Sequence, residues 1–199
     1  DNPQIQKALM WGWFAGSLLT SLVLGVAFAN FFKGLEIASG GVYKGTLPGL
    51  FGPYALIGGV LFVLMSVTSG ALWINVKTEG AIAAKAGDLA KKSTLIVLVL
   101  ALVFLAYSFV GIEGFTTNYS ATPALYLLPV LAVVAAVLAV FFVKKDRGFP
   151  AFCSNLLALL FVVQSGLASI YPYMLKSSVS PEYGIDIFEA ASSHMTLSI

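Results

Sequence analysis

The sequence contains little charge. Only 10% of its 199 residues are Lys, Arg, Asp or Glu, whereas 59% are hydrophobic. Soluble domains usually carry about 25% charged residues, so this chain has too little polar surface to cover a water-soluble globule. The formal net charge of +2 is also too small to indicate nucleic-acid binding. We therefore expect a membrane protein with no nucleic-acid partner.

Residues that serve redox and metal chemistry are equally scarce. The sequence has one cysteine, Cys153, and one histidine, His194. A single cysteine forms neither an internal disulfide nor a paired-cysteine metal site. Haem needs His, Met or Cys ligands inside the helices, and Met65 is the methionine in the middle of an apolar run, where the residue typically packs. We expect no catalytic, cofactor-binding or metal-binding residue in this chain.

Long apolar runs dominate the sequence. Runs of this length predict an all-α fold, a polytopic transmembrane helix bundle in a single domain. The expected spans are residues 8–32, 49–76, 94–112, 123–143 and 149–171, followed by a loop over residues 172–199 that leads to a missing helix. A charged residue at a helix centre costs about 2.5–3.5 kcal/mol on insertion scales and normally marks function. None of the five spans has one in its interior, so we expect no charged proton relay within them.

The positions of the basic residues predict the orientation of the spans. Loops rich in Lys and Arg normally face the cytoplasm. One side is expected to hold eight basic residues and the other side three: Lys7, Lys77, Lys85, Lys91, Lys92, Lys144, Lys145 and Arg147, against Lys33, Lys44 and Lys176. The loops Lys77–Lys92 and Lys144–Arg147 are then cytoplasmic, and residues 172–199 are extracytoplasmic. Residues 81–92 also suggest a short amphipathic helix on the membrane surface.

Small and amide residues suggest where helices meet. Gly12, Gly16 and Thr20 follow a four-residue spacing that lets a neighbouring helix approach closely. Ser66 and Gly70 repeat this spacing in the second span, where a further helix contact is expected.

The most polar span is the fifth. Asn155 and Gln164 within it are expected to face other helices, since an amide in hydrocarbon needs a partner.

The remaining polar residues are expected to have structural roles. Glu113 lies between two glycines, as in a solvated turn, and Glu189 precedes a segment that suits the start of a helix. The serine pairs at 177–178 and 192–193 fit turns and caps. His194 is expected to be a surface or capping residue.

Five segments together resemble one protein family. They are GVAFANFFKGLEI (25–37), PYALIGGVLFVLMSVTSGALWINVKTEGAIAAKA (53–86), GIEGF (111–115), YPYMLKSS (171–178) and FEAASSHMTL (188–197). In this order they resemble subunit II of the cytochrome bd-type quinol oxidases, over nearly the whole chain. The family usually has a Trp-Asp pair where this chain has Phe188 and Glu189.

The resemblance implies a function for the complex. A complete subunit has about nine membrane helices, so this sequence would be a C-terminal portion that lacks the first helices and the last. The subunit pairs with a similarly folded subunit I, which holds haems b and d. The complex oxidises quinol, reduces dioxygen to water and builds a proton gradient across a bacterial or archaeal plasma membrane. Membrane lipid and a small third subunit are further partners that the resemblance allows.

Two other functions agree with the residues alone. The chain could be a fragment of a secondary transporter or permease, because such proteins place polar sites near the middle of the membrane. Gln164 and Ser165 are the candidates for such a site. A membrane chaperone or anchor would need neither redox activity nor transport.

Overall fold

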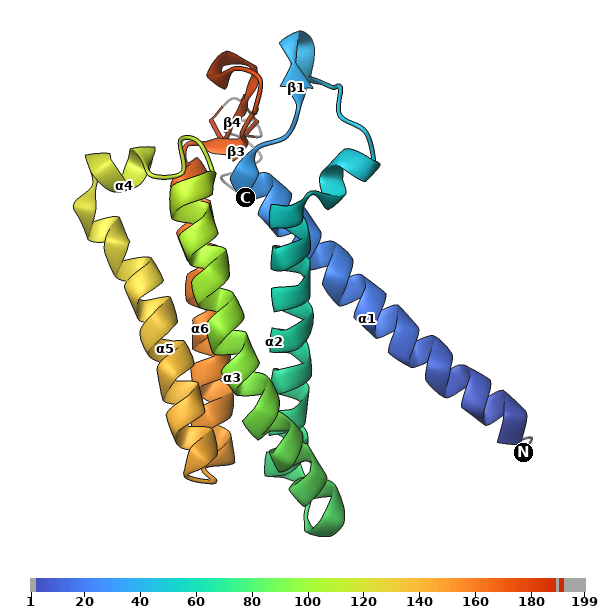
Figure 1. Cartoon of the computed structure of the whole chain (residues 1–199). Helices are drawn as coiled ribbons and strands as arrows, with labels where there is room; N and C mark the ends of the chain where they lie inside the picture. Colours follow the sequence, from blue (N-terminus) through green and yellow to red (C-terminus); the bar gives the residue numbers. More distant parts are fainter. Residues whose placement is uncertain (1–2, 189, 192–199) are drawn as a thin grey trace, which may run out of the picture.

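A computed structural model of the chain describes residues 3–188 and 190–191. It is a bundle of long helices with two small hairpins at one end (Figure 1). Five helical segments are long and apolar enough to cross a membrane, which confirms the expected all-α polytopic bundle. The long helices are α1 (Pro3–Lys33), α2 (Pro53–Lys77), α3 (Gly80–Gly111), α5 (Leu127–Lys144) and α6 (Gly148–Ile170).

Short helices join the long ones. Two 3-10 turns precede α2: η1 (Ser39–Gly41), and η2 (Pro48–Phe51) within the region expected to begin the second span. Between α3 and α5 lie α4 (Thr117–Ala121) and the 3-10 turn η3 (Pro123–Tyr126).

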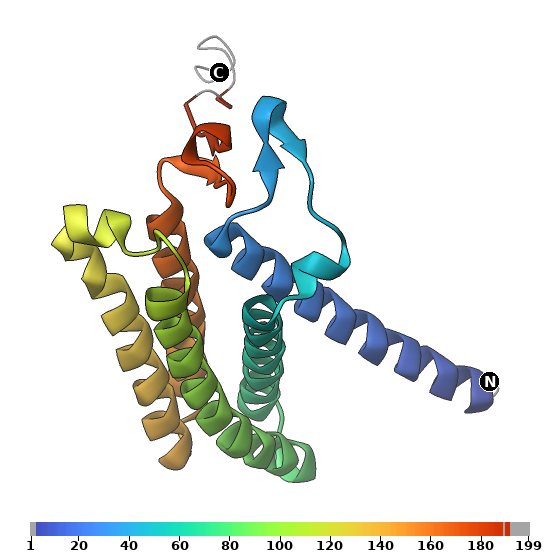
Figure 2. The ribbon, with the colours of Figure 1, turned by 45° about the horizontal axis from the view of Figure 1, so that its top comes forward.

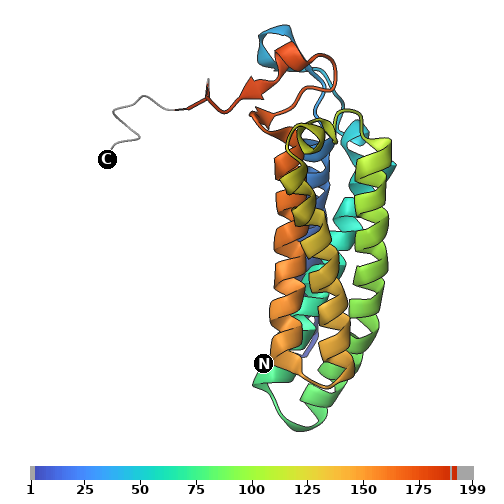
Figure 3. The ribbon, with the colours of Figure 1, turned by 90° about the vertical axis from the view of Figure 1, so that its left-hand side faces the viewer.

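Four of the long helices lie side by side and the fifth leans away. Figure 3 shows α2, α3, α5 and α6 running roughly together, whereas Figures 1 and 2 show α1 crossing α2 and leaving the bundle toward its N-terminal end. The main core is built from apolar side chains of α1, α2, α3, α5 and α6. The first half of α1 is exposed along its described length.

Residues 81–92 do not form a separate surface helix. They are the first three turns of α3, which continues without a break through the expected third span to Gly111. The segment is rich in alanine and has no proline, so nothing interrupts the helix. Ala86 and Ala90 are buried, and Ala90 packs in a core cluster with residues of α2, α5 and α6. This packing holds the segment against the bundle, and only Thr78 and Glu79 separate α2 from α3.

The two hairpins lie at the same end of the bundle, which we call the hairpin end. Strands β1 (Ile37–Ala38) and β2 (Val42–Tyr43) form one antiparallel pair. The segment after α6 forms a second pair, β3 (Tyr173–Leu175) with β4 (Ile185–Asp186), and the 3-10 turn η4 (Pro181–Tyr183) lies between its strands. The described residues do not include Glu189, residues 192–193 or His194, so the roles expected for them stay predictions.

The helices α1 and α2 approach each other closely where they cross. A Cβ added at Gly25 would lie 2.6 Å from the Phe62 Cβ and 2.7 Å from the Gly58 carbonyl oxygen. A Cβ at Gly59 would lie 2.9 Å from atoms of Leu22 and Val26. Glycine is therefore required on both helices, because any side chain would separate the two backbones.

The expected contacts at the other small residues are not formed within the described chain. No described atom lies within 4 Å of a Cβ placed at Gly12, Gly16 or Gly70. Contacts of these positions with another chain stay a prediction.

The two amides of α6 have opposite environments. Asn155 is 1% exposed, and its side-chain nitrogen donates to the Ser69 hydroxyl at 2.8 Å and to the Met65 carbonyl at 3.3 Å. It therefore links α6 to α2, as expected. Gln164 lies on the exposed face of α6. The expectation that Gln164 faces another helix is wrong for the described chain, because the buried stripe of α6 passes through Val162, Ser165 and Gly166 instead.

We expect Gly25→Ala to destabilise the protein by about 1–3 kcal/mol, since overpacking of a close contact costs that much. Thermal unfolding of the full-length protein in detergent measures the effect. Gly12→Ala is the matched control, because its added Cβ meets no described atom. Equal melting temperatures for the two variants would contradict the close crossing.

The bond between Asn155 and Ser69 is expected to give a measurable coupling energy. In a double-mutant cycle, Asn155→Ala and Ser69→Ala should couple by about 0.6 kcal/mol and by no more than about 1.7 kcal/mol, the range found for hydrogen bonds between membrane helices. Ser66→Ala is the control on the same helix, because Ser66, like Ser69, donates to a carbonyl of its own helix but makes no described bond with Asn155. Coupling of Asn155 to Ser66 as strong as that to Ser69 would refute the assignment.

Candidate functional site

The surroundings of Met65 leave no room for a haem. Among them there is no group of three or more His, Cys, Asp or Glu side chains that could hold a metal ion. Met65 is 1% exposed and packed in the main core, and the apolar cavity that it lines measures only about 30 Å³, far too small for a porphyrin. Cys153 is a free, half-buried thiol on α6. We therefore assign no ligand role to either residue.

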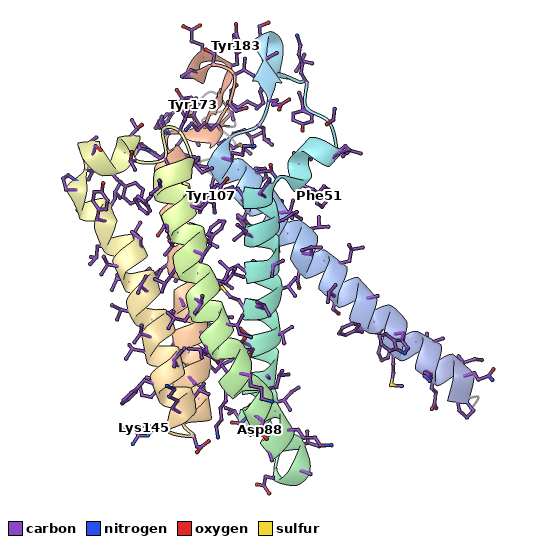
Figure 4. All side chains as sticks on the ribbon, viewed as in Figure 1. Phe51, Asp88, Tyr107, Lys145, Tyr173 and Tyr183 are labelled. Carbon is purple, nitrogen blue, oxygen red and sulfur yellow. The ribbon has the colours of Figure 1, made fainter. Side chains whose placement is uncertain are left out.

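A cleft lies at the hairpin end of the described chain. Its volume is about 780 Å³, and we call it the hairpin-end cleft. Its walls are the ends of α1, α3 and α6, the start of α4, and the segment that leads into β3 and η4. The lining residues are 33, 111–114, 117–118, 169–173 and 176–181. Figure 4 labels one of them, Tyr173, close to the end of the bundle where β3 begins.

One wall of the cleft is the α4 segment held against the end of α6. The side-chain nitrogen of Asn118 donates to the carbonyl of Ala168 at 2.9 Å and to that of Tyr171. These carbonyls have no partner inside the helix, so Asn118 satisfies groups that a helix end leaves free. The Tyr119 hydroxyl donates to the Ser165 carbonyl at 2.7 Å. Burial raises the pKa of Tyr119 to about 12, so the hydroxyl keeps its proton at physiological pH.

The opposite wall is fixed by backbone pairing between segments far apart in the sequence. The Leu35 amide donates to the Lys176 carbonyl, and the Ser178 amide donates to the Leu35 carbonyl, each at 2.8 Å. Gly34 precedes this bridge with a φ of +94°, a left-handed conformation that favours glycine. The buried Ser177 hydroxyl donates to the Ile37 carbonyl and accepts from the Val179 amide, so its expected turn role is confirmed.

The charges of the cleft are two lysines and one glutamate. The ammonium of Lys176 donates to the Glu113 carbonyl oxygen at 2.9 Å. Burial lowers the pKa of Lys176, and the nearby charge of Glu113 opposes that shift. Lys33, the last residue of α1, is exposed and has no hydrogen bond or ion pair with the described residues. The cleft therefore contains a half-buried cation and a free one.

The sequence did not reveal this cleft. Glu113 is exposed in a turn, as the sequence predicts, but the sequence does not show that its backbone carbonyl accepts a hydrogen bond from Lys176, 63 positions later. The glycines at 34, 111 and 114 are the local signal of tight turns on its walls, but their spacing does not say that the turns meet.

The opposite end of the bundle holds a second polar cluster. Lys91 and Asp146 form an ion pair with a nitrogen–oxygen distance of 2.7 Å, and the Asn75 side chain donates to the Ala83 carbonyl at 2.9 Å. The side chains of the ion pair are 44% and 77% exposed, so water screens the attraction between them. Figure 4 shows Asp88 and Lys145 at the same end. The cluster joins α2, α3 and the turn before α6, which is a structural role.

The residues proposed for a transport site do not come together. Ser165 is fully buried and its hydroxyl donates to the Phe161 carbonyl at 2.7 Å, whereas Gln164 points to the exposed face. The helix α6 also continues without a break through both residues. The described chain therefore does not form, at Gln164 and Ser165, the polar site that the transporter alternative would need.

Comparison with known proteins identifies the family. The family model for cytochrome bd terminal oxidase subunit II matches residues 1–199. A probable cytochrome oxidase subunit 2 of Haemophilus influenzae is 33% identical over all of this chain and 60% of its own length. The cytochrome bd-I ubiquinol oxidase subunit 2 of Escherichia coli K12 is 27% identical over 95% of this chain and 58% of its own length. The cytochrome bd ubiquinol oxidase subunit 2 of Bacillus subtilis is 28% identical over 96% of this chain and 56% of its own length.

The chain thus spans somewhat more than half the length of these relatives. The match of the family model over every residue, together with an all-α membrane bundle, agrees with the resemblance of the five sequence segments. The chain belongs to the cytochrome bd terminal oxidase subunit II family.

Proposed function

We propose that the chain is part of a non-haem subunit of a quinol:dioxygen oxidoreductase, which scaffolds a haem-bearing subunit I. The observation that carries this proposal is the family match over residues 1–199. Two of the relatives are named as subunits of ubiquinol oxidases, which supports quinol as the substrate of the complex. The partner would hold haems b and d, and the complex of the two subunits would oxidise quinol, reduce dioxygen to water and build a proton gradient.

The packing of the described chain supports a scaffolding role. The spans are held together by close helix crossings and by buried side chains that bond within the chain, as at Gly25 and Asn155. The charged residues of the long helices lie toward their ends. Large apolar side chains such as Trp11, Trp13 and Phe14 are exposed on α1, as suits a surface that lipid or another membrane helix covers.

The proposed orientation places the hairpin end outside the cell. The loops near Lys85 and Lys145 would face the cytoplasm, because they carry most of the basic residues. The membrane would be a bacterial or archaeal plasma membrane.

Visible spectra test the non-haem assignment. The full-length protein should show no haem absorption when it is expressed alone, and the haem bands should appear when it is co-expressed with subunit I. Quinol oxidase activity should require both subunits. Stoichiometric haem in the subunit expressed alone would overturn the proposal.

Cysteine labelling tests the orientation. In a Cys153→Ala background, Lys44→Cys should react with a membrane-impermeant maleimide added to whole cells, and Lys85→Cys should react only after the cells are opened. Both positions are exposed, so reactivity depends on the side of the membrane. The reverse labelling pattern would show that the orientation is wrong.

A further inference from the structure

We propose that the hairpin-end cleft binds the phosphate group of an anionic phospholipid, with Lys33 and Lys176 as its cationic ligands. This inference is independent of the proposed oxidase function, because it depends only on the cleft and on the embedding of the helices in a membrane. Nothing in the family match assigns a ligand to this cleft.

The position of the cleft suits a lipid headgroup. Its walls include Lys33, Gly111 and Ile170, which are the last residues of α1, α3 and α6. The cleft therefore lies where three apolar helices end, and the polar headgroup region of a bilayer begins at that level. Figure 3 shows the ends of α3 and α6 at similar heights below the hairpins.

The charges of the cleft complement a phosphodiester. Lys33 and Lys176 supply two positive charges and Glu113 one negative charge, which leaves one positive charge. A phosphodiester carries one negative charge. Lys176 uses one of its three N–H donors on the Glu113 carbonyl, so two donors are left for a ligand. Lys33 has no hydrogen bond or ion pair with the described residues, so binding a ligand would break none.

The neutral hydrogen-bond donors and the volume of the cleft also suit a lipid headgroup. The hydroxyls of Thr117, Ser178 and Ser180 line the cleft and make no side-chain hydrogen bond with the described residues. The volume of about 780 Å³ lies within the range of about 300–1,000 Å³ that is usual for small-molecule sites. Inorganic phosphate would fill only a small part of it, whereas a glycerophosphate headgroup with its ester groups would fill much more.

The last turns of α3 and α6, two helices whose ends line the cleft, carry exposed apolar side chains. Val110, in the last turn of α3, is 90% exposed, and Leu167, in the last turn of α6, is 40% exposed. Acyl chains would lie along such surfaces while the phosphate stays with the lysines. This combination of an apolar approach and a cationic end favours a lipid over a free anion.

The test uses the full-length protein in its purified complex, stripped of lipid in detergent. Isothermal titration with short-chain phosphatidylglycerol, short-chain phosphatidylcholine and inorganic phosphate compares the possible ligands. Phosphatidylglycerol should bind most tightly, and Lys33→Gln should weaken it about tenfold, the effect of losing one charge-assisted hydrogen bond. Lys176→Gln should act similarly, and Lys176→Arg should keep most of the affinity.

Lys44→Gln is the matched control, because Lys44 is an exposed lysine at the same end that does not line the cleft. The affinity of this variant for phosphatidylglycerol should stay within twofold of that of the wild type. Lys33→Gln removes no described contact, so its result does not depend on a disturbed fold. The proposal is overturned if Lys33→Gln leaves the affinity unchanged, if phosphatidylcholine binds equally well, or if inorganic phosphate binds as tightly as the lipid.

Discussion

Hydrocarbon offers polar groups no hydrogen-bond partner, and this constraint organises the described chain. The hydroxyls of Thr68, Thr94 and Ser165 each donate to the carbonyl four residues earlier in their own helix. A hydroxyl satisfied in this way is free to lie in a packed interface without needing the neighbouring helix. The helices are then joined mainly by apolar packing and close backbone approach, with a few specific bonds such as that from Asn155 to Ser69.

Because of the same constraint, charged residues and irregular backbone lie at the two ends of the bundle. One end is closed by short turns, where two residues separate α2 from α3 and the Lys91–Asp146 pair lies near the water. The other end carries longer connections, which pair through Leu35 and Lys176 and enclose a cleft. The difference between the ends follows from connection length, since only long connections can fold over the helices and bury a lysine.

Apolar run length was sufficient to predict the five spans, but not how they meet. The four-residue spacing of small residues pointed to Gly12 and Gly16, whereas the close crossing uses Gly25. Residues 81–92 have an amphipathic pattern that suggested a surface helix. Burial of Ala90 against other helices makes the segment part of the bundle instead. The cleft could not be predicted either, because its charges come from positions 33, 113 and 176, which only the tertiary fold brings together.

A site that binds or reacts needs polar groups whose bonding capacity is not already used. Within the described spans such groups are scarce: the buried side-chain atom without a partner is the Asn155 carbonyl oxygen, in the packed contact between α2 and α6. The unused donors of Lys33, Lys176 and the cleft serines lie at or beyond the ends of the helices instead. The described chain therefore separates its tasks, with a membrane interior built for packing and a ligand-competent surface at the membrane boundary.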